Sequence, residues 1–314
     1  LRGAVGNFRI SKLDAILIVA GLGGGTGSGG DPVLAEELQH VYREPVYGLG
    51  VLPAQEEGGI YNRNAAQTLK RFSEKVDNLI LWDNDAWRAS GESIEGGYAE
   101  MNTQLVTRIG ELFSAGEINS NSSDVGETVV DSSEIINTLD NSGLSSIGYS
   151  TTKIEGLSEN NGLLSKFGFG NSTTKSDRFD ESIDSSNRIT SIVREATLGK
   201  KTLPVNVEST EKALIVVAGP PEYINRKGLD NARTWLEDNI KSMEVRAGDY
   251  PIKGATQLSA IVLLSGVTDS NRIKQRQKTA VEAQNNIEEL RENGSKDFDN
   301  LINDNEEMDE LESL

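Results

Sequence analysis

The sequence predicts an α/β fold in which helices cover a parallel sheet. Three apolar runs of strand length occur within the first 85 residues, and segments with helical spacing separate them. Strands and helices that alternate in this way form right-handed βαβ units. A second alternating set follows residue 119. We therefore expect two α/β domains joined by a long central helix.

The first half begins with residues 13–20 (LDAILIVA), a nearly continuous apolar run that is typical of a strand buried on both faces. Asp31 and Pro32 are favourable residues for a helix start, so we expect a helix from there to residue 42. The other expected elements of this half are a strand over 45–53, a helix over 62–76, a strand over 78–83 and a long helix over 98–118.

The second half begins after a polar segment at 119–127, which resembles a domain hinge. We expect Asp131 to cap a helix, and the Gly-, Ser-, Thr- and Asn-rich residues 153–184 to form a long surface loop. The further expected elements are helices over 186–198, 227–241 and 272–290 and strands over 212–219, 243–247 and 258–266. Residues 291–314 are too highly charged to pack alone, so we expect a disordered acidic tail.

The composition excludes several classes of function. A net charge of -18 argues against binding to nucleic-acid phosphates or to anionic membrane surfaces, and it fits a salt-rich cytoplasm. The chain has no cysteine, and its one histidine, His40, is expected on the surface, so we expect no transition-metal site. No apolar run approaches the roughly 20 residues of a membrane span, and no signal peptide is visible, so we expect a cytoplasmic protein. Because Leu1 replaces an initiator Met, we also expect the N-terminus to be incomplete.

A glycine-rich segment, AGLGGGTGSGG at residues 20–30, lies between the first strand and the next helix. Glycines let backbone N–H groups point at phosphate oxygens, and a helix N-terminus adds about 0.3–1 kcal/mol toward negative charge. Thr26 and Ser28 add hydroxyl donors. A Walker A loop is excluded because no Lys-Ser/Thr pair follows. Gly25, Gly27 and Gly30 satisfy G-x-G-x-x-G, so a dinucleotide-dependent oxidoreductase stays an alternative, as does a flexible loop without a ligand.

GGGTGSG at residues 23–29 resembles the signature of the tubulin and FtsZ superfamily. The resemblance continues through LPAQEEGG, NAAQTL and NLILWDNDAWR, and it is strongest to the archaeal tubulin-like CetZ branch. It covers the chain to about residue 290, apart from residues 153–184. The resemblance implies a partial Rossmann-like GTP-binding domain with the central helix (1–118), a GTPase-activating domain (119–290) and the acidic tail (291–314).

The resemblance also implies a guanine-nucleotide pocket. Glu57 resembles the ribose-binding carboxylate, Asn84 and Asn102 the base-reading amides, and Tyr98 the aromatic that stacks on guanine. The residues that resemble the phosphate loop are Gly23, Gly24, Gly25, Thr26 and Gly27. Taken singly, Asn84 favours a turn cap and Tyr98 a core residue, but their joint order and placement favour the pocket.

Two further features flank the pocket in the sequence. Tyr61 stands where the bacterial branch has a phosphate-contacting Arg. Trp82 and Trp87 bracket Asn84, and we expect them to pack in the core rather than to stack on a ligand.

Asp131 and Glu134 are the candidate catalytic residues. Their i, i+3 spacing at a helix start by itself predicts a capping box. The resemblance implies that they polarise the water that attacks GTP bound to a neighbouring subunit, with Mg²⁺ on the phosphates. Val129 stands where the family has an Asn.

The resemblance thus implies a cytoskeletal GTPase that binds GTP or GDP, assembles head to tail with itself and acts in cell shape or division. A protein partner at the acidic tail is a further expectation. Val129 and Tyr61 keep a non-hydrolysing structural member of the same fold as an alternative.

Overall fold

A seven-stranded mixed sheet forms the centre of the molecule in the computed structural model, which describes residues 13–88, 94–117, 129–154, 175–240 and 244–303. Along the sheet the strand order is β1-β2-β3-β4-β7-β5-β6. The strands are β1 (Ile16–Gly21), β2 (Val46–Leu52), β3 (Asn78–Asp83), β4 (Leu144–Lys153), β5 (Lys212–Gly219), β6 (Glu244–Pro251) and β7 (Gln257–Val267). The predicted α/β class is confirmed.

The first three strands run parallel, and their carboxyl ends lie side by side. Gly21 pairs with Val51, and Val51 pairs with Trp82. β3 meets β4 in parallel over only two pairs, whereas β7 runs antiparallel to both β4 and β5. The sheet therefore consists of a parallel part and a mixed part that meet at β3 and β4.

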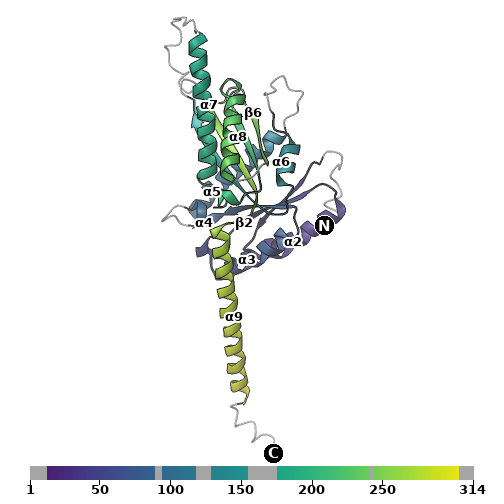
Figure 1. The fold of residues 1–314 in the computed structure, drawn as a ribbon. Coiled ribbons are helices and arrows are strands. Elements are labelled where there is room, and N and C mark those ends of the chain that lie inside the picture. The colour runs from purple at the N-terminus through teal and green to yellow at the C-terminus, as the bar shows by residue number, and fades with distance from the viewer. Residues whose placement is uncertain (1–12, 89–93, 118–128, 155–174, 241–243, 304–314) are drawn as a thin grey trace, which may run out of the picture.

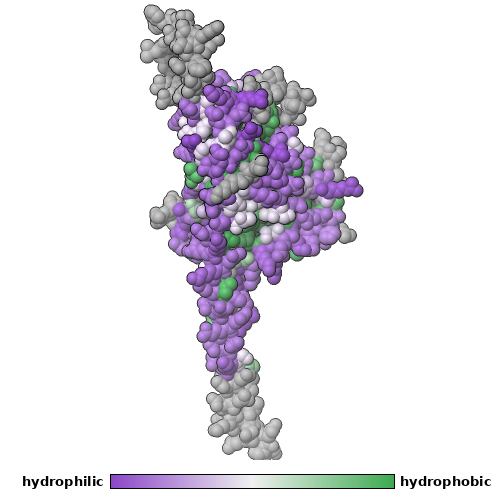
Figure 2. All heavy atoms as spheres, in the orientation of Figure 1, coloured by the Kyte–Doolittle hydropathy of each residue, from purple (hydrophilic) through white to green (hydrophobic). Residues whose placement is uncertain are grey.

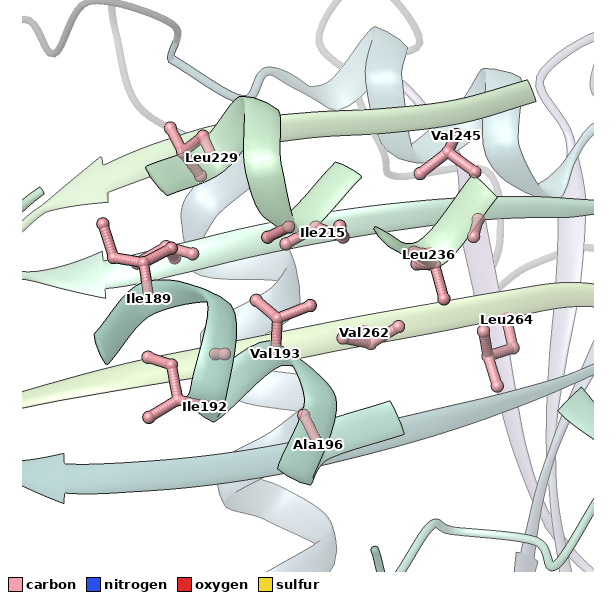
Figure 3. Packing of buried hydrophobic residues seen from close by; sticks show 14 of the residues in the cluster. Ile189, Ile192, Val193, Ala196, Ile215, Leu229, Leu236, Val245, Val262 and Leu264 are labelled. Carbon is pink, nitrogen blue, oxygen red and sulfur yellow. The ribbon is translucent and has the colours of Figure 1, made fainter. Parts of the chain in front are cut away.

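Helices cover both faces of the sheet (Figure 1). They are α2 (Gly25–Val41), α3 (Gly59–Ser73), α4 (Asn84–Trp87), α5 (Ile94–Gly116), α6 (Ser132–Leu139), α7 (Lys175–Leu198), α8 (Arg226–Ile240) and α9 (Asn271–Asn303), with short 3-10 turns η2 (Gln55–Glu57), η4 (Val207–Ser209) and η5 (Pro221–Tyr223). α2 and α3 share a buried cluster with β1 and β3, and α7 and α8 share one with β5 and β7. Figure 3 shows Val193 of α7 beside Val262 of β7.

On the opposite face, α5 and α6 pack against strands from both parts of the sheet. Leu112 of α5 and Leu139 of α6 lie in one cluster with Leu49 of β2 and Leu263 of β7. Because this cluster is fully buried and spans both parts, it fixes the central helix to the whole sheet rather than to one domain.

Four expectations about elements are wrong. The chain after residue 140 forms β4, which the sequence analysis omits because its Ser- and Thr-rich sequence lacks an apolar run. α2 begins at Gly25 rather than after Asp31, and α7 begins at Lys175, inside the expected loop. The expected tail is helical up to Asn303, because Glu, Lys and Arg favour helices.

The projecting part of α9 extends away from the body and shows mainly hydrophilic surface (Figures 1 and 2). Among the side chains of α9 that the structure describes, Val281, Leu290 and Phe298 are exposed apolar ones. The whole of the expected hinge at 119–127 lies outside the described residues, as do residues 304–314 of the expected tail.

Candidate functional site: a helix N-terminus at the sheet edge and an acidic helix start

The glycine loop leads directly into α2 at the carboxyl end of β1. Gly24 occupies the N-cap position with no side-chain cap, and the first turn carries no acidic residue. The bond from the Ser28 N–H to the Gly24 carbonyl is 2.9 Å long. The N–H groups of Gly25, Thr26 and Gly27 precede this bond, so they have no acceptor within the helix. An uncapped N-terminus without acids is suited to an anion.

Gly27 has no space for a side chain. A Cβ at this position would overlap the carbonyl oxygen of Gly21, whereas a Cβ at Gly29 would meet no atom within 4 Å. Gly23 is also confined, with Pro53 and Tyr61 at 3.1–3.3 Å from an added Cβ. The glycines at 23 and 27 therefore allow α2 to begin directly against the ends of β1 and β2.

Pro32 lies inside α2, where it cannot donate to the carbonyl of Ser28 four residues earlier. The hydroxyl of Thr68, on α3, donates to that carbonyl at 3.5 Å instead. The start that Asp31 and Pro32 suggested is thus an interior turn. Burial raises the pKa of Asp31.

Glu57, Asn84 and Tyr98 meet beside the glycine loop. The N–H of Ala54 donates to Glu57 Oε1 at 2.6 Å, and Asn84 Nδ2 donates to the same oxygen at 3.3 Å. Burial raises the pKa of Tyr98, and the negative charge and hydrogen bond of Glu57 raise it further, so its hydroxyl stays protonated and donates. The structure therefore brings three of the predicted pocket residues together. Asn102 lies on α5 one turn after Tyr98, with its side chain exposed.

A buried ion cluster supports the strand ends, and no motif in the sequence marks it. Arg276 of α9 is 2% exposed and donates to Asp85 at 2.9 Å and to fully buried Asp83 at 3.4 Å. It also donates to the carbonyl of Pro53 and to Asn62. Arg272, one turn earlier, donates to Asp83 at 2.5 Å. Burial lowers the pKa of Arg276, and Asp83 opposes that effect.

The candidate acids lie at the start of α6. Asp131 caps the helix by accepting from the Glu134 N–H at 3.1 Å, and the Ser133 hydroxyl donates to it at 2.5 Å. The hydrogen bond from Ser133 lowers the pKa of Asp131, so this carboxyl is ionised at neutral pH. Glu134 does not complete a capping box but pairs with Arg246 of β6 at 2.7 Å. Val129, the departure from the family pattern, forms an isolated bridge with Asp249.

The acids and the pocket lie at opposite ends of α5. Tyr98 lies in the second turn of this helix, whereas Gly116, its last residue, packs against Ser132 and Ile135 of α6. At about 1.5 Å per residue, the segment between Tyr98 and Gly116 is about 27 Å long. Asp131 and Glu134 therefore cannot reach the predicted pocket of their own chain.

Two structural observations define the class of protein: a glycine loop that opens a helix at a parallel sheet edge, and a central helix that leads to a mixed sheet. The family model of the tubulin/FtsZ GTPase domain matches residues 7–92, and that of the tubulin-like CetZ C-terminal domain matches residues 91–282. The chain is thus a tubulin/FtsZ superfamily member.

Similar proteins define the branch. Tubulin-like protein CetZ1 of Haloferax volcanii is 52% identical over 296 residues, which cover 93% of this chain and 73% of that protein. CetZ3 of the same organism is 51% identical, with the same coverage. The chain belongs to the tubulin-like CetZ family.

Solved structures give the same result. A GDP-bound monomer of Haloferax volcanii CetZ1 has a TM-score of 0.75 and 47% identity, over 90% of this chain and 74% of that one. A GTPγS-bound protofilament of CetZ2 from this organism has a TM-score of 0.75 and 37% identity, over 91% of this chain and 75% of that one. Among the described residues, no helix is long and apolar enough to cross a membrane.

Proposed function

We propose that this chain is a subunit of a cytoskeletal GTPase that binds guanine nucleotide and assembles head to tail. The observation that carries the proposal is the pair of unlike helix starts at the two ends of α5, one free of acids and one carrying two. The GTPγS-bound protofilament of CetZ2, a relative with 37% identity, supports it. Control of cell shape or cell division is the proposed role.

In the proposed pocket, the N–H groups of Gly23–Gly27 and the hydroxyl of Thr26 bind the terminal phosphates. Glu57, which the Ala54 N–H holds in place, accepts from the ribose hydroxyls. Asn84 and Tyr98 exchange their contacts with Glu57 for contacts with the base, and Asn102 joins them from the next turn of α5.

Mg²⁺ neutralises phosphate charge in phosphoryl transfer. Among the described residues no three His, Cys, Asp or Glu side chains are grouped to hold a metal. Mg²⁺ does not need such a group of side chains, because it is commonly held by phosphates, water and few carboxylates. We therefore propose that the nucleotide itself supplies most of its ligands.

Hydrolysis is proposed to occur between subunits. Asp131 is ionised and exposed. Its carboxylate is therefore able to accept a hydrogen bond from the attacking water and to orient that water toward the phosphate of the neighbouring copy. Glu134 adds a second carboxylate beside it. A head-to-tail contact of this kind is heterologous and forms open filaments. The domains proposed for this mechanism are 1–118 and 119–290.

The test uses full-length protein with Glu134→Ala. We expect unchanged nucleotide affinity, loss of most phosphate release and longer-lived filaments. Asp140→Ala, an exposed acid just after the same helix, is the matched control and should leave all three unchanged. Unchanged turnover in Glu134→Ala would remove the catalytic assignment.

A non-hydrolysing structural member of the fold is the second candidate. The ion pair between Glu134 and Arg246 favours it, because a carboxylate engaged by a guanidinium is less available to water. Phosphate release measured above and below the assembly concentration separates the two candidates, since only the first requires a rise on assembly.

A further inference from the structure

Trp82 contacts the proposed base-reading side chain directly. Its indole Nε1–H donates to Asn84 Oδ1 at 3.1 Å, and both side chains are buried, with 1% and 8% exposure. An indole nitrogen only donates, so the amide atom that faces it must be the oxygen. The amide nitrogen of Asn84 is thereby turned the other way, toward Glu57 at 3.3 Å.

We propose that Trp82 is a positioning residue that holds Asn84 with its N–H donor toward the nucleotide base. An asparagine amide is otherwise able to flip and present either a donor or an acceptor. The inference rests on the proposed function, because it assumes that Asn84 contacts the base of a bound nucleotide.

The indole of Trp82 is itself held rigidly. It stacks on Trp87 with ring centroids 4.6 Å apart and planes 18° from parallel. Arg108 of α5 and Lys200 each lie 4.2 Å from the Trp87 ring, and Trp87 Nε1 donates to the Lys201 carbonyl at 3.1 Å. The orientation of the Asn84 amide is thus fixed by the core before any ligand arrives.

A fixed donor has a chemical consequence for the choice of base. Guanine carries an acceptor, O6, where adenine carries the N6 amine, which is a donor. An N–H of Asn84 that faces this position of the base fits the first and opposes the second. Trp82 therefore turns an ambiguous amide into one that selects guanine over adenine.

The experiment compares Trp82→Phe with Trp87→Phe in full-length protein, by measuring the affinities for GTP and for ATP. Both variants keep a ring in the stacked pair and lose one indole N–H, but only Trp82 donates to Asn84. For Trp82→Phe we expect GTP affinity to fall about fivefold to tenfold and the GTP-to-ATP ratio to fall with it. Trp87→Phe should keep the wild-type ratio.

Asn84→Ala gives a second readout that does not depend on how well Trp82→Phe folds. It should lower the GTP-to-ATP ratio, and adding Trp82→Phe to it should change the ratio no further. The proposal is overturned if Asn84→Ala keeps the wild-type ratio, or if the two tryptophan variants behave alike. Wild-type protein that binds no guanine nucleotide contradicts the proposed function instead.

Discussion

The N-termini of α2 and α6 are both helix starts near the ends of α5, and they are built in opposite ways. α2 begins with glycines, has no side-chain cap and has no acid in its first turn. α6 is capped by Asp131 and carries Glu134 in its first turn. The helix dipole favours an anion at both starts. At α6 the chain supplies that anion itself, whereas α2 leaves its N–H groups available for one.

The two sites also differ in what supports them. The α6 cap is local, because Asp131, Ser133 and the Glu134 N–H lie within four residues. The loops near α2 depend on Arg276 of α9, which lies 191 positions after its partner Asp85. We therefore expect the cap of α6 to tolerate substitutions elsewhere in the chain, and the loops near α2 to be sensitive to distant substitutions.

The largest expected effect is on that long-range support. Arg276→Leu leaves buried Asp83 with Arg272 alone and removes the donor to Asn62 and to the Pro53 carbonyl, and each buried polar group that loses its partner costs about 1–3 kcal/mol. We expect a matching loss in the free energy of unfolding, measured by urea denaturation. Arg226→Leu removes an exposed pair with Asp230 and should change it by less than about 0.5 kcal/mol. Equal losses would contradict the difference between the two sites.

The second prediction concerns the close approach at α2. Gly27→Ala pushes the loop away from Gly21, and overpacking costs about 1–3 kcal/mol; if that cost falls on the bound state, GTP affinity drops about 5- to 150-fold. Gly29→Ala, in the same helix with open space around it, should keep wild-type affinity. Fluorescent-nucleotide titration measures both. Wild-type affinity in Gly27→Ala would show that the loop does not hold the phosphates.

The third prediction separates capping from chemistry at α6. Asn caps helices about as well as Asp, so Asp131→Asn should lower the thermal midpoint less than Asp131→Ala does, while phosphate release falls by about tenfold or more. Asn keeps the cap but removes the charge. If turnover stays at the wild-type rate, Asp131 is a cap and nothing more.

The smallest expected effect is the pH dependence of that cap. Asp131→Ala should cost about 1 kcal/mol of stability at neutral pH. Because the pKa of Asp131 is lowered on folding, its contribution is present above the unfolded value and is lost as pH falls through the folded value. The difference in thermal midpoint between wild type and Asp131→Ala should therefore be constant from pH 7 to about pH 5 and shrink below about pH 4. A difference that grows on acidification would contradict the assigned direction.

Most strands were predictable because they are apolar runs. β3 and β5 have the predicted bounds. β4 was not predictable in this way. Its buried Ser145 and Ser146 hydroxyls donate hydrogen bonds to residues far along the chain, to Asn78 and to the Leu203 carbonyl. Sequence patterns record local spacing and not such distant hydrogen bonds.

The site shows the same limit. The glycine loop, Glu57, Asn84 and Tyr98 were identified through motifs, and their assembly follows from the shared edge of the parallel strands. Arg272 and Asp83 are 189 positions apart, so no local pattern marks the pair. The interpretation of Trp82 as a packing residue is confirmed by its stack on Trp87, but its bond to Asn84 was not foreseen.

The central claim is that the acids of one copy act on the nucleotide of the next. Mixing Glu134→Gln subunits, which keep the pocket, with Gly27→Ala subunits, which keep the acids, tests it most directly. Each variant alone should release phosphate near the background rate. The account predicts that the mixture releases phosphate well above the sum of the two, because intact acids then face bound GTP across mixed contacts. Phosphate release equal to that sum, in mixtures that sedimentation shows to co-assemble, would contradict it.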